Sequence, residues 1–514
     1  MARPAAAEAP AARCPIRRDS VSVHAVIVSH PSIIQGGMGV AVSNWVLARA
    51  VAIEGQMGVV SGTALDVVLV RRLEMGDSDG SMRRGLAAFP IPGVADRVLE
   101  KYFIEGGKTA TERFTQKPLV SHRPSQALTE LLVVANFVEV WLAKEGHDGV
   151  VGINFLEKLQ PPTLASIYGA MLADVDYVLM GAGIPRSIPG ILDKLSVGET
   201  AELRLDVKGA HKDDNFVMRF DPTAFSRGRI IDLKRPKFLA IITSDVLAKM
   251  LATKANGFVD GFIVEMPVAG GHNAPPRGKL QLSDEGEPIY GDRDVPKLEN
   301  IVALGRPFWL AGGFATAQGL RDAQAVGAVG VQIGTAFAYC EESGFTEEIK
   351  MGVLAMSRAG EAKVKTDPRA SPTGFPFKVL QIKGSLSVES VYQERERVCD
   401  LGYLRTAYRR ENGKIGWRCP SEPIDDYLAK GGKMEETVGR KCVCNALCSA
   451  IGMPQIQFNG AVEGDLVTSG DDVATIARFL PQGSATYSAV HVINTILGIA
   501  APAIAESEVA ESIV

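Results

Sequence analysis

The stretch FWLAGGFAT, residues 308–316, decides the fold class of this 514-residue chain. It begins with apolar residues typical of a short buried strand, continues through Gly312 and Gly313, and reaches Thr316, a residue type that commonly begins a helix. A strand that ends in a tight glycine turn and leads directly into a helix is typical of parallel α/β folds. The stretch therefore predicts one βα unit of such a fold.

The stretch GVQIGTAF, residues 330–337, repeats this order with Gly334 and Thr335. In (β/α)8 barrels, the loops after the seventh and eighth strands commonly bind a phosphate, because bare backbone N–H groups and a helix N-terminus favour an anion there. We expect these two turns to bind a phosphate, although they could simply be tight connections.

Eight short apolar runs alternate with helical patterns along most of the chain. This alternation indicates a parallel sheet, and eight strands favour a (β/α)8 TIM barrel over a doubly wound sheet. The predicted strands cover residues 32–35, 57–61, 150–154, 177–181, 238–242, 262–265, 308–313 and 330–335.

The composition limits the classes of function. The formal net charge is −4, from 55 Lys+Arg against 59 Asp+Glu, so no basic surface for nucleic acid is indicated. No stretch predicts a membrane span. The predicted organisation is a disordered tail (1–20), a barrel (21–370) with insertions at about 75–130 and 196–230, the second a small strand pair, and a smaller, mostly helical, cysteine-containing module (371–514).

Five of the seven cysteines lie in the last quarter of the chain. The C-x-C-x3-C spacing is not a standard zinc pattern, so we expect no metal, with a zinc or iron–sulfur site as the alternative. Without a secretory signal, the cysteines indicate a reducing, cytoplasmic compartment. The candidate ligands are Cys399, Cys419, Cys442, Cys444 and Cys448.

The loop VEMPVAGGHNAPPRG, residues 264–278, places a histidine beyond a strand end. His272 is therefore the catalytic candidate, although a single histidine is often structural. Pro275 and Pro276 stiffen the loop behind it. Arg277 could attract an anionic substrate or could be a solvated surface residue.

Further strand ends carry groups suited to a planar ligand. In the run IIQGGMG, Gly36 and Gly37 allow the backbone to lie flat against a ring, and Met38 adds a soft apolar contact. Ser61 and Asn154 add a hydroxyl and an amide that could bond the heteroatom edge of a flavin.

The motifs IIQGGMG, VVSGT, GIN, AGGH, AGGFAT and QIGTAF occur in this order. Together they resemble the nitronate monooxygenase (2-nitropropane dioxygenase) family of FMN-dependent barrels over roughly residues 30–380. In length, the chain is similar to the long branch near the enoyl reductases of polyunsaturated-fatty-acid synthases. The resemblance implies FMN as cofactor and His272 as the residue that approaches it. The predicted cofactor site comprises Gln35, Gly36, Gly37, Met38, Ser61, Asn154, Gly270, Gly271, Gly312, Gly313, Gln332, Gly334 and Thr335.

Two departures from the family pattern leave the substrate open. Compact nitronate monooxygenases usually have a proline where Gly37 stands, and they have a shorter loop after the histidine. From the family resemblance, we expect a nitronate oxidase that uses O2. The alternatives are an NAD(P)H-dependent enoyl reductase acting with the acyl carrier protein of a synthase, and an inactive, metal-stapled binding protein. The oligomeric state is open, and a homodimer is compatible with the sequence.

Overall fold

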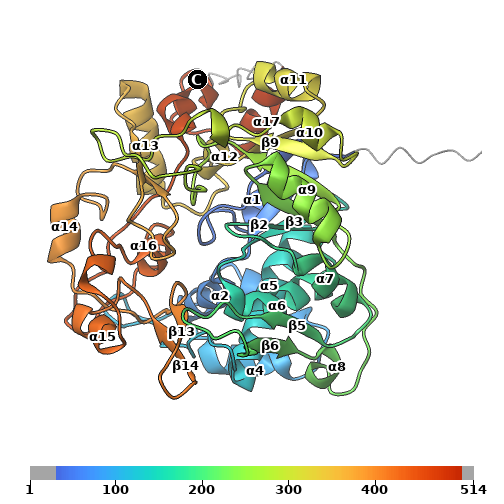
Figure 1. Ribbon diagram of the computed structural model, residues 1–514, viewed down its shortest axis with the longest axis vertical. Coiled ribbons are helices and arrows are strands. Elements are labelled where there is room, and N and C mark those ends of the chain that lie inside the picture. The colour runs from blue at the N-terminus through green and yellow to red at the C-terminus, as the bar shows by residue number, and fades with distance from the viewer. Residues whose placement is uncertain (1–29, 500–514) are drawn as a thin grey trace, which may run out of the picture. The chain divides into compact units, whose positions relative to one another are not determined.

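Eight parallel strands form a closed barrel in the computed structural model of the chain, which describes residues 30–499 (Figure 1). The strand order is β1-β10-β9-β8-β7-β4-β3-β2, and a parallel bridge between Ile34 and Met57 joins the first strand to the last. The predicted (β/α)8 TIM barrel is confirmed. Its strands are β1 (Ile33–Gln35), β2 (Gly58–Ser61), β3 (Val151–Leu156), β4 (Tyr177–Gly181), β7 (Lys237–Ile242), β8 (Gly261–Glu265), β9 (Phe308–Ala311) and β10 (Gly330–Ile333).

Alternate residues of these strands fill the inside of the barrel. Large side chains such as Tyr177, Leu239 and Trp309 pack there in one apolar cluster, while their sequence neighbours face the surrounding helices. Trp309 is fully buried. Because the interior is filled, a ligand can enter only at an end of the barrel.

Two of the helices between strands begin at polar residues whose side chains cap them. Ser244 accepts a hydrogen bond from the backbone of Leu247 at the start of α9, and Thr316 accepts one from Gly319 at the start of α11. These caps fix where each chain segment leaves the carboxyl end of a strand. The connecting helices are α1 (Trp45–Ile53), α2 (Leu65–Glu74), α6 (Gln160–Leu172), α7 (Ile188–Ser196), α9 (Asp245–Lys254), α10 (Leu298–Val302), α11 (Ala317–Ala325) and α12 (Thr335–Ala338), with η1 (Asp292–Asp294) before α10.

The first insertion contains α3 (Ser81–Ala87) and α4 (Val94–Tyr102), and it is followed by the long α5 (Gln126–Lys144). Helix α5 was not predicted from the sequence. Its own apolar residues lie on nearly all sides of the helix and so give no one-sided pattern. By length and composition alone, α5 could cross a membrane, but its most apolar window is 78% buried inside the protein. It packs against α6, α1 and α2, which cover its apolar surface.

The second insertion is the predicted small strand pair. Strands β5 (Ala201–Arg204) and β6 (Val217–Phe220) pair antiparallel, and the short α8 (Pro222–Phe225) follows them. Phe220 packs against Tyr168 of α6, with the ring centroids 4.9 Å apart. The pair therefore covers a barrel helix and does not contribute to the barrel wall.

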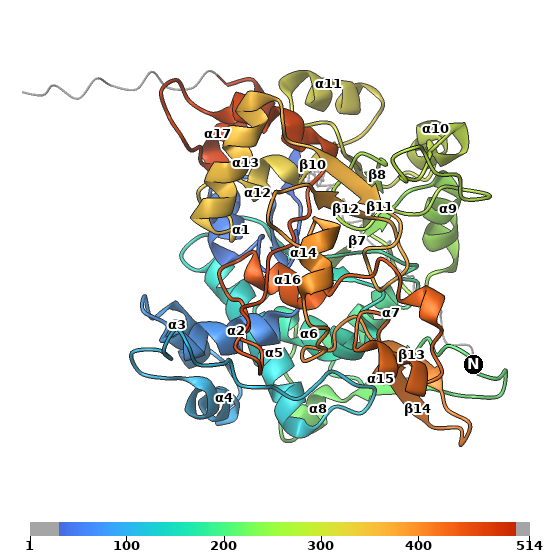
Figure 2. The ribbon, with the colours of Figure 1, turned by 90° about the vertical axis from the view of Figure 1, so that its left-hand side faces the viewer.

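The region after the barrel strands is less helical than the sequence analysis expected. Strands β11 (Val364–Asp367) and β12 (Phe377–Leu380) pair across the predicted boundary near residue 370. In Figures 1 and 2, α14, α15 and α16 lie together on one side of the barrel. The remaining elements are α13 (Glu347–Ala359), α14 (Glu389–Glu394), β13 (Thr406–Arg409), β14 (Ile415–Arg418), α15 (Ile424–Ala429), η2 (Met434–Glu436), α16 (Val443–Ser449), η3 (Asp471–Phe479) and α17 (Ala489–Leu497). The predicted tail at 1–20 lies outside the described residues.

Candidate active site

A cavity of about 190 Å³ lies at the carboxyl ends of the barrel strands. This end is where enzymes of this fold carry their chemistry, because eight loops converge there. Every strand contributes to the wall at or next to its carboxyl end. These wall residues are Gly36, Ser61, Asn154, Gly181, Ile241, Glu265, Ala311 and Gln332.

The structure brings nearly all of the predicted cofactor residues to this one cavity. His272 lines the cavity together with them. The predicted cofactor residues that line it are Gly36, Gly37, Met38, Ser61, Asn154, Gly270, Gly271, Gly312, Gly313, Gln332, Gly334 and Thr335.

Gln35 is the exception, because it is fully buried behind the cavity wall. Its side-chain amide donates to the carbonyl oxygen of Gly36 at 2.5 Å and to the Ser43 hydroxyl at 2.8 Å. Its amide oxygen accepts from the backbone N–H of Val59 at 3.0 Å. The expected contact of Gln35 with a cofactor is therefore corrected: the side chain braces the glycine turn.

The turn after β9 has the backbone that an anion site requires. Gly312 and Gly313 have φ angles of +94° and +83°, which a residue with a Cβ adopts only with strain. A Cβ on Gly312 would also lie 3.0 Å from the backbone nitrogen of Ala269. The glycines therefore allow the β8 and β9 loops to approach closely while their backbone groups line the cavity.

Two buried polar atoms of cavity-lining residues have no hydrogen-bond partner in the protein. They are Asn154 Oδ1 and Gln332 Oε1. Asn154 is held in place, because its amide nitrogen donates to the carbonyl oxygen of Gly37 at 3.2 Å. Unpaired buried polar atoms are costly, so their presence around one cavity indicates a polar ligand.

His272 lines the cavity in a fixed position. Its Nε2 lies 2.7 Å from the Ser371 hydroxyl, and its ring packs against Phe377 with the centroids 4.6 Å apart. Ser371 in turn is hydrogen-bonded to Thr373 at 2.8 Å. Burial lowers the pKa of His272 to about 4, so the imidazole is neutral near pH 7 and can accept a proton.

Glu265 is a cavity residue that the sequence analysis did not identify. It stands at the end of β8 and faces the main cavity and also a smaller neighbouring cavity of about 30 Å³. Burial raises the pKa of its carboxyl to about 7. A carboxyl group at the end of a strand is common in sequences, so only its enclosure marks it as an acid or base.

Arg277, the predicted substrate residue, lines only the smaller neighbouring cavity. It is exposed, its guanidinium donates to the carbonyl oxygen of Thr243 at 3.2 Å, and its backbone N–H donates to Asp294 at 2.7 Å. This position corrects the expectation that Arg277 joins the other site residues.

Residues 468–472, far from the barrel strands in sequence, also line the cavity. Gly470 donates its backbone N–H to the Thr335 hydroxyl at 3.0 Å, and Asp471 donates its N–H to the carbonyl oxygen of Val268 at 3.2 Å. Thr468, Ser469 and Asp472 complete the contribution of this 468–472 segment. This segment could not be identified from the sequence, because TSGDD has the composition of an ordinary turn.

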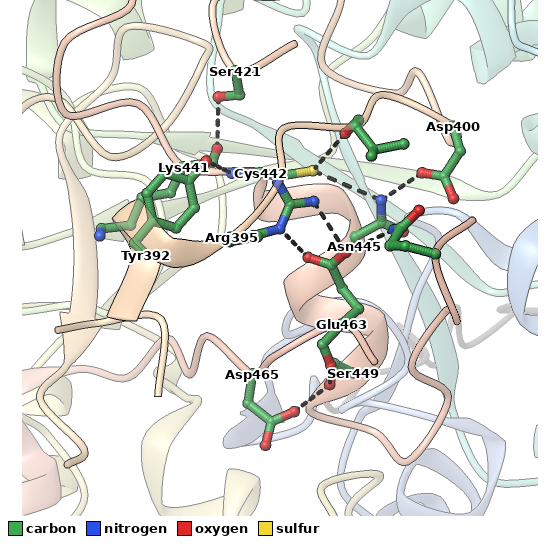
Figure 3. Close-up of polar contacts among 12 residues, drawn as sticks. Tyr392, Arg395, Asp400, Ser421, Lys441, Cys442, Asn445, Ser449, Glu463 and Asp465 are labelled. Atoms are coloured by element: carbon green, nitrogen blue, oxygen red, sulfur yellow. Dashed lines mark hydrogen bonds and ion pairs between the residues drawn. The ribbon is translucent and has the colours of Figure 1, made fainter. Parts of the chain in front are cut away.

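The cysteines lie in a separate region with its own polar network, drawn in Figure 3. The backbone N–H of Cys442 donates to the Tyr392 hydroxyl at 2.9 Å, and Asn445 donates to Asp400. Arg395 forms a buried ion pair with Glu463 nearby. These contacts join α14, α16 and the loops around them.

The thiols of this region are mostly held in their neutral form. Burial raises the pKa of Cys442 to about 12, and it also raises the pKa values of Cys444 and Cys448. Hydrogen bonding with Cys419 lowers the pKa of Cys399 and raises that of Cys419. Within residues 30–499, no group of three or more His, Cys, Asp or Glu residues is arranged to hold a metal ion.

Comparison with known proteins finds similarity to nitronate monooxygenases. Residues 196–369, about a third of the chain, match the nitronate monooxygenase family model, and this stretch contains His272 and both phosphate-type turns. The resemblance to nitronate monooxygenases is confirmed. Over 131 residues the chain is 34% identical to a probable nitronate monooxygenase of Staphylococcus haemolyticus. The match covers 25% of this chain and 35% of that protein, so the chain spans about a third of the length of this relative.

Solved structures resemble the chain over most of its length at low identity. A nitroalkane oxidase of Streptomyces ansochromogenes is 15% identical with a TM-score of 0.44, covering 91% of this chain and 95% of that one. FabK of Thermotoga maritima is 17% identical with a TM-score of 0.43, covering 92% of each chain. The enoyl reductase domain of MlnA from Bacillus amyloliquefaciens is 11% identical with a TM-score of 0.42, covering 91% and 93%.

Proposed function

We propose that the protein is an FMN-dependent oxidoreductase that oxidises nitronates, using O2 as the electron acceptor. The observation that carries the proposal is the single cavity at the barrel mouth, where His272, the glycine turns and unpaired polar atoms meet. The match to the nitronate monooxygenase family over residues 196–369 supports an oxidoreductase of this type.

The residues present fit FMN. The turns at Gly312–Gly313 and at Gly334–Thr335 would hold its phosphate, because backbone N–H groups and a hydroxyl favour an anion. Asn154 Oδ1 and Gln332 Oε1, both buried and unpaired, would accept hydrogen bonds from the polar edge of the ring. Gly37 leaves room for this arrangement, because a Cβ there would lie 2.4 Å from the Cβ of Asn154.

FMN when bound supplies the redox chemistry, and the protein supplies binding, orientation and proton transfer. The apolar wall formed by residues such as Val268 and Phe377 limits water at the substrate. His272 is the proposed base for a neutral nitroalkane, which must lose a carbon-bound proton before oxidation. The Ser371 hydroxyl, 2.7 Å from Nε2, holds the ring in its orientation.

Glu265 is a second proposed proton carrier. A group with a pKa of about 7 exchanges protons readily at neutral pH, whereas a group with a pKa of about 4 is a weaker base. Because Glu265 borders both the main cavity and the neighbouring one, it can pass a proton between them. We propose that His272 takes the substrate proton and that Glu265 is a second group of the same cavity that exchanges protons with solvent.

The experiment that tests the function mixes purified, FMN-loaded protein anaerobically with a nitronate and, separately, with NADPH. Bleaching of the flavin absorbance by the nitronate, with recovery of the colour on admission of O2, is expected. Bleaching by NADPH alone would contradict the oxidase assignment and favour a reductase. No bleaching by either compound would contradict both assignments.

A further inference from the structure

The 468–472 segment lies directly on the turns proposed to hold the cofactor phosphate. Its Gly470 N–H donates to Thr335 Oγ1 at 3.0 Å, and the N–H of Asp471 donates to the carbonyl oxygen of Val268 at 3.2 Å. A Cβ on Gly470 would come within 2.7 Å of Thr335 Oγ1 and 3.1 Å of the backbone nitrogen of Gly270. The segment is thus packed against both the β8 and the β10 loops.

Side chains on either side of this contact hold the segment in place. Asp471 forms an ion pair with the buried Lys378 of β12, at 2.8 Å. Further along η3, Arg478 donates to the carbonyl oxygen of Ala315 at 3.2 Å, which ties the helix to the loop that follows β9. The residue between these two anchors, Asp472, therefore has little freedom to move away from the cavity.

Asp472 itself is half-buried, and it lines the cavity together with Gly312 and Gly313. Burial is the main cause that raises the pKa of its carboxyl. Asp471 adds repulsion, and Arg478 attracts the ionised form. The Asp472 carboxyl thus lies in the same cavity as the turn that would hold the phosphate.

We propose that Asp472 determines how strongly the site discriminates between phosphorylated and unphosphorylated flavin, by competing with the FMN phosphate for the turn after β9. This inference rests on the proposed FMN site. The carboxylate and the phosphate are both anions, so they repel each other when both are present in this cavity. Riboflavin lacks the phosphate and therefore does not compete with Asp472.

The test measures the dissociation constants of FMN and riboflavin by quenching of flavin fluorescence, for the full chain freed of flavin. Asp472→Asn removes the charge while keeping the size and one hydrogen-bond acceptor, and Asp472→Ala removes the side chain. A matched control is Asp322→Asn, which neutralises an exposed carboxylate on α11 that does not line the cavity. Circular dichroism and the melting temperature establish that each variant is folded.

We expect both Asp472 variants to bind FMN about tenfold more tightly than the wild type, as removal of one like charge near the phosphate predicts. Riboflavin affinity stays unchanged, and the control variant resembles the wild type with both ligands. The gain shrinks as salt concentration rises, because salt screens the repulsion.

Other results overturn the inference. Equal weakening of FMN and riboflavin in both variants would mean that the carboxylate binds the ribityl hydroxyls instead. Unchanged affinities for both flavins would mean that Asp472 does not reach the phosphate. If the wild type binds neither flavin, the proposed FMN cofactor is wrong and this inference fails with it. If the wild type binds both flavins but the variants show no selective gain in FMN affinity, only this inference is rejected.

Discussion

The cavity at the barrel mouth and the small cavity among the cysteines both contain residue types used in catalysis or metal binding, but they differ in size. The first has a volume of about 190 Å³, and the second about 10 Å³. The second is lined by four thiols, those of Cys399, Cys419, Cys442 and Cys444. Its volume is close to the space that one water molecule needs.

The polar atoms around each cavity differ in what could satisfy them. Near the cysteines, Asn445 Oδ1 and Asp400 Oδ2 lack partners, and Cys399 and Asp400 also border a further cavity of about 190 Å³. At the barrel mouth, the unpaired atoms of Asn154 and Gln332 come from two different strands of a much larger wall. The comparison indicates that reactive residue types and unpaired polar atoms alone do not mark a ligand site; at the barrel mouth they coincide with the carboxyl ends of all eight strands.

The largest effect expected at the barrel mouth is that of His272→Asn. The variant keeps a similar size but cannot take up a proton, so the rate with a neutral nitroalkane, if one is accepted, should fall by about 10²–10⁴-fold. The rate with the corresponding nitronate should fall much less, because that substrate has already lost its proton. Steady-state kinetics on both substrates, with FMN content measured, makes this comparison.

The exposed His211→Asn serves as the control and should leave both rates unchanged. Equal losses on the two substrates in His272→Asn would mean that the ring positions the substrate or binds its charge. No loss of rate on either substrate would show that His272 is a structural residue. The barrel-mouth cavity would then lack the proposed catalytic base that distinguishes it from the cysteine cavity.

A smaller effect is expected from Glu265→Gln on pH-dependent stability. Because burial raises the pKa of Glu265 to about 7, the native state holds this proton more tightly than the unfolded state. The stabilisation of the native state by this bound proton is fully present below about pH 4. It decreases as the pH rises to about 7 and is absent above that pH. Relative to wild type, the variant should therefore become more stable by about 1–3 kcal/mol as pH increases across that range.

Urea unfolding of both proteins at a series of pH values checks this prediction. The exposed Glu361→Gln is the control and should show no such trend. A wild-type-to-variant difference that stays constant with pH would show that Glu265 titrates normally, and its proposed proton transfer would then be unsupported.

The smallest effect is expected at the cysteine cavity. If the thiols only pack, elemental analysis should find less than one metal ion per chain, and a strong chelator should leave the melting temperature unchanged. The raised pKa values of Cys442, Cys444 and Cys448 oppose the deprotonation that metal binding requires. One zinc or several irons per chain would contradict this prediction and make the two cavities two functional sites.

Most of the barrel could be predicted from sequence because each strand is a short apolar run that ends at a turn. The sequence analysis placed all eight strands, and it also found the β5–β6 pair. Helix α5 was not predicted, because its apolar residues are buried on almost every side and show no helical pattern of one apolar face. The region after residue 370 was less predictable, since its short strands and helices depend on contacts between distant segments.

The site could be predicted where the backbone itself carries the signal. Glycines at the ends of β1, β9 and β10 mark close approach, and they do line the cavity. Gln35 was assigned to the wrong side of the wall, because sequence does not show which way a strand-end side chain turns. Glu265 and Asp472 could not be found, because their importance comes from enclosure by residues far away in the chain.

The measurement that tests the central claim most directly is FMN binding to Gly313→Asp. A carboxylate at this position adds repulsion beside the phosphate, so the affinity should fall by about 100-fold or more, whereas the wild type should bind one FMN per chain. Gly305→Asp is the matched control: Gly305 has a similar φ of +65°, has open space around it and does not line the cavity. Loss of FMN binding in Gly313→Asp alone is the predicted result. A wild type that takes up no FMN, or equal binding by both variants, would contradict the account.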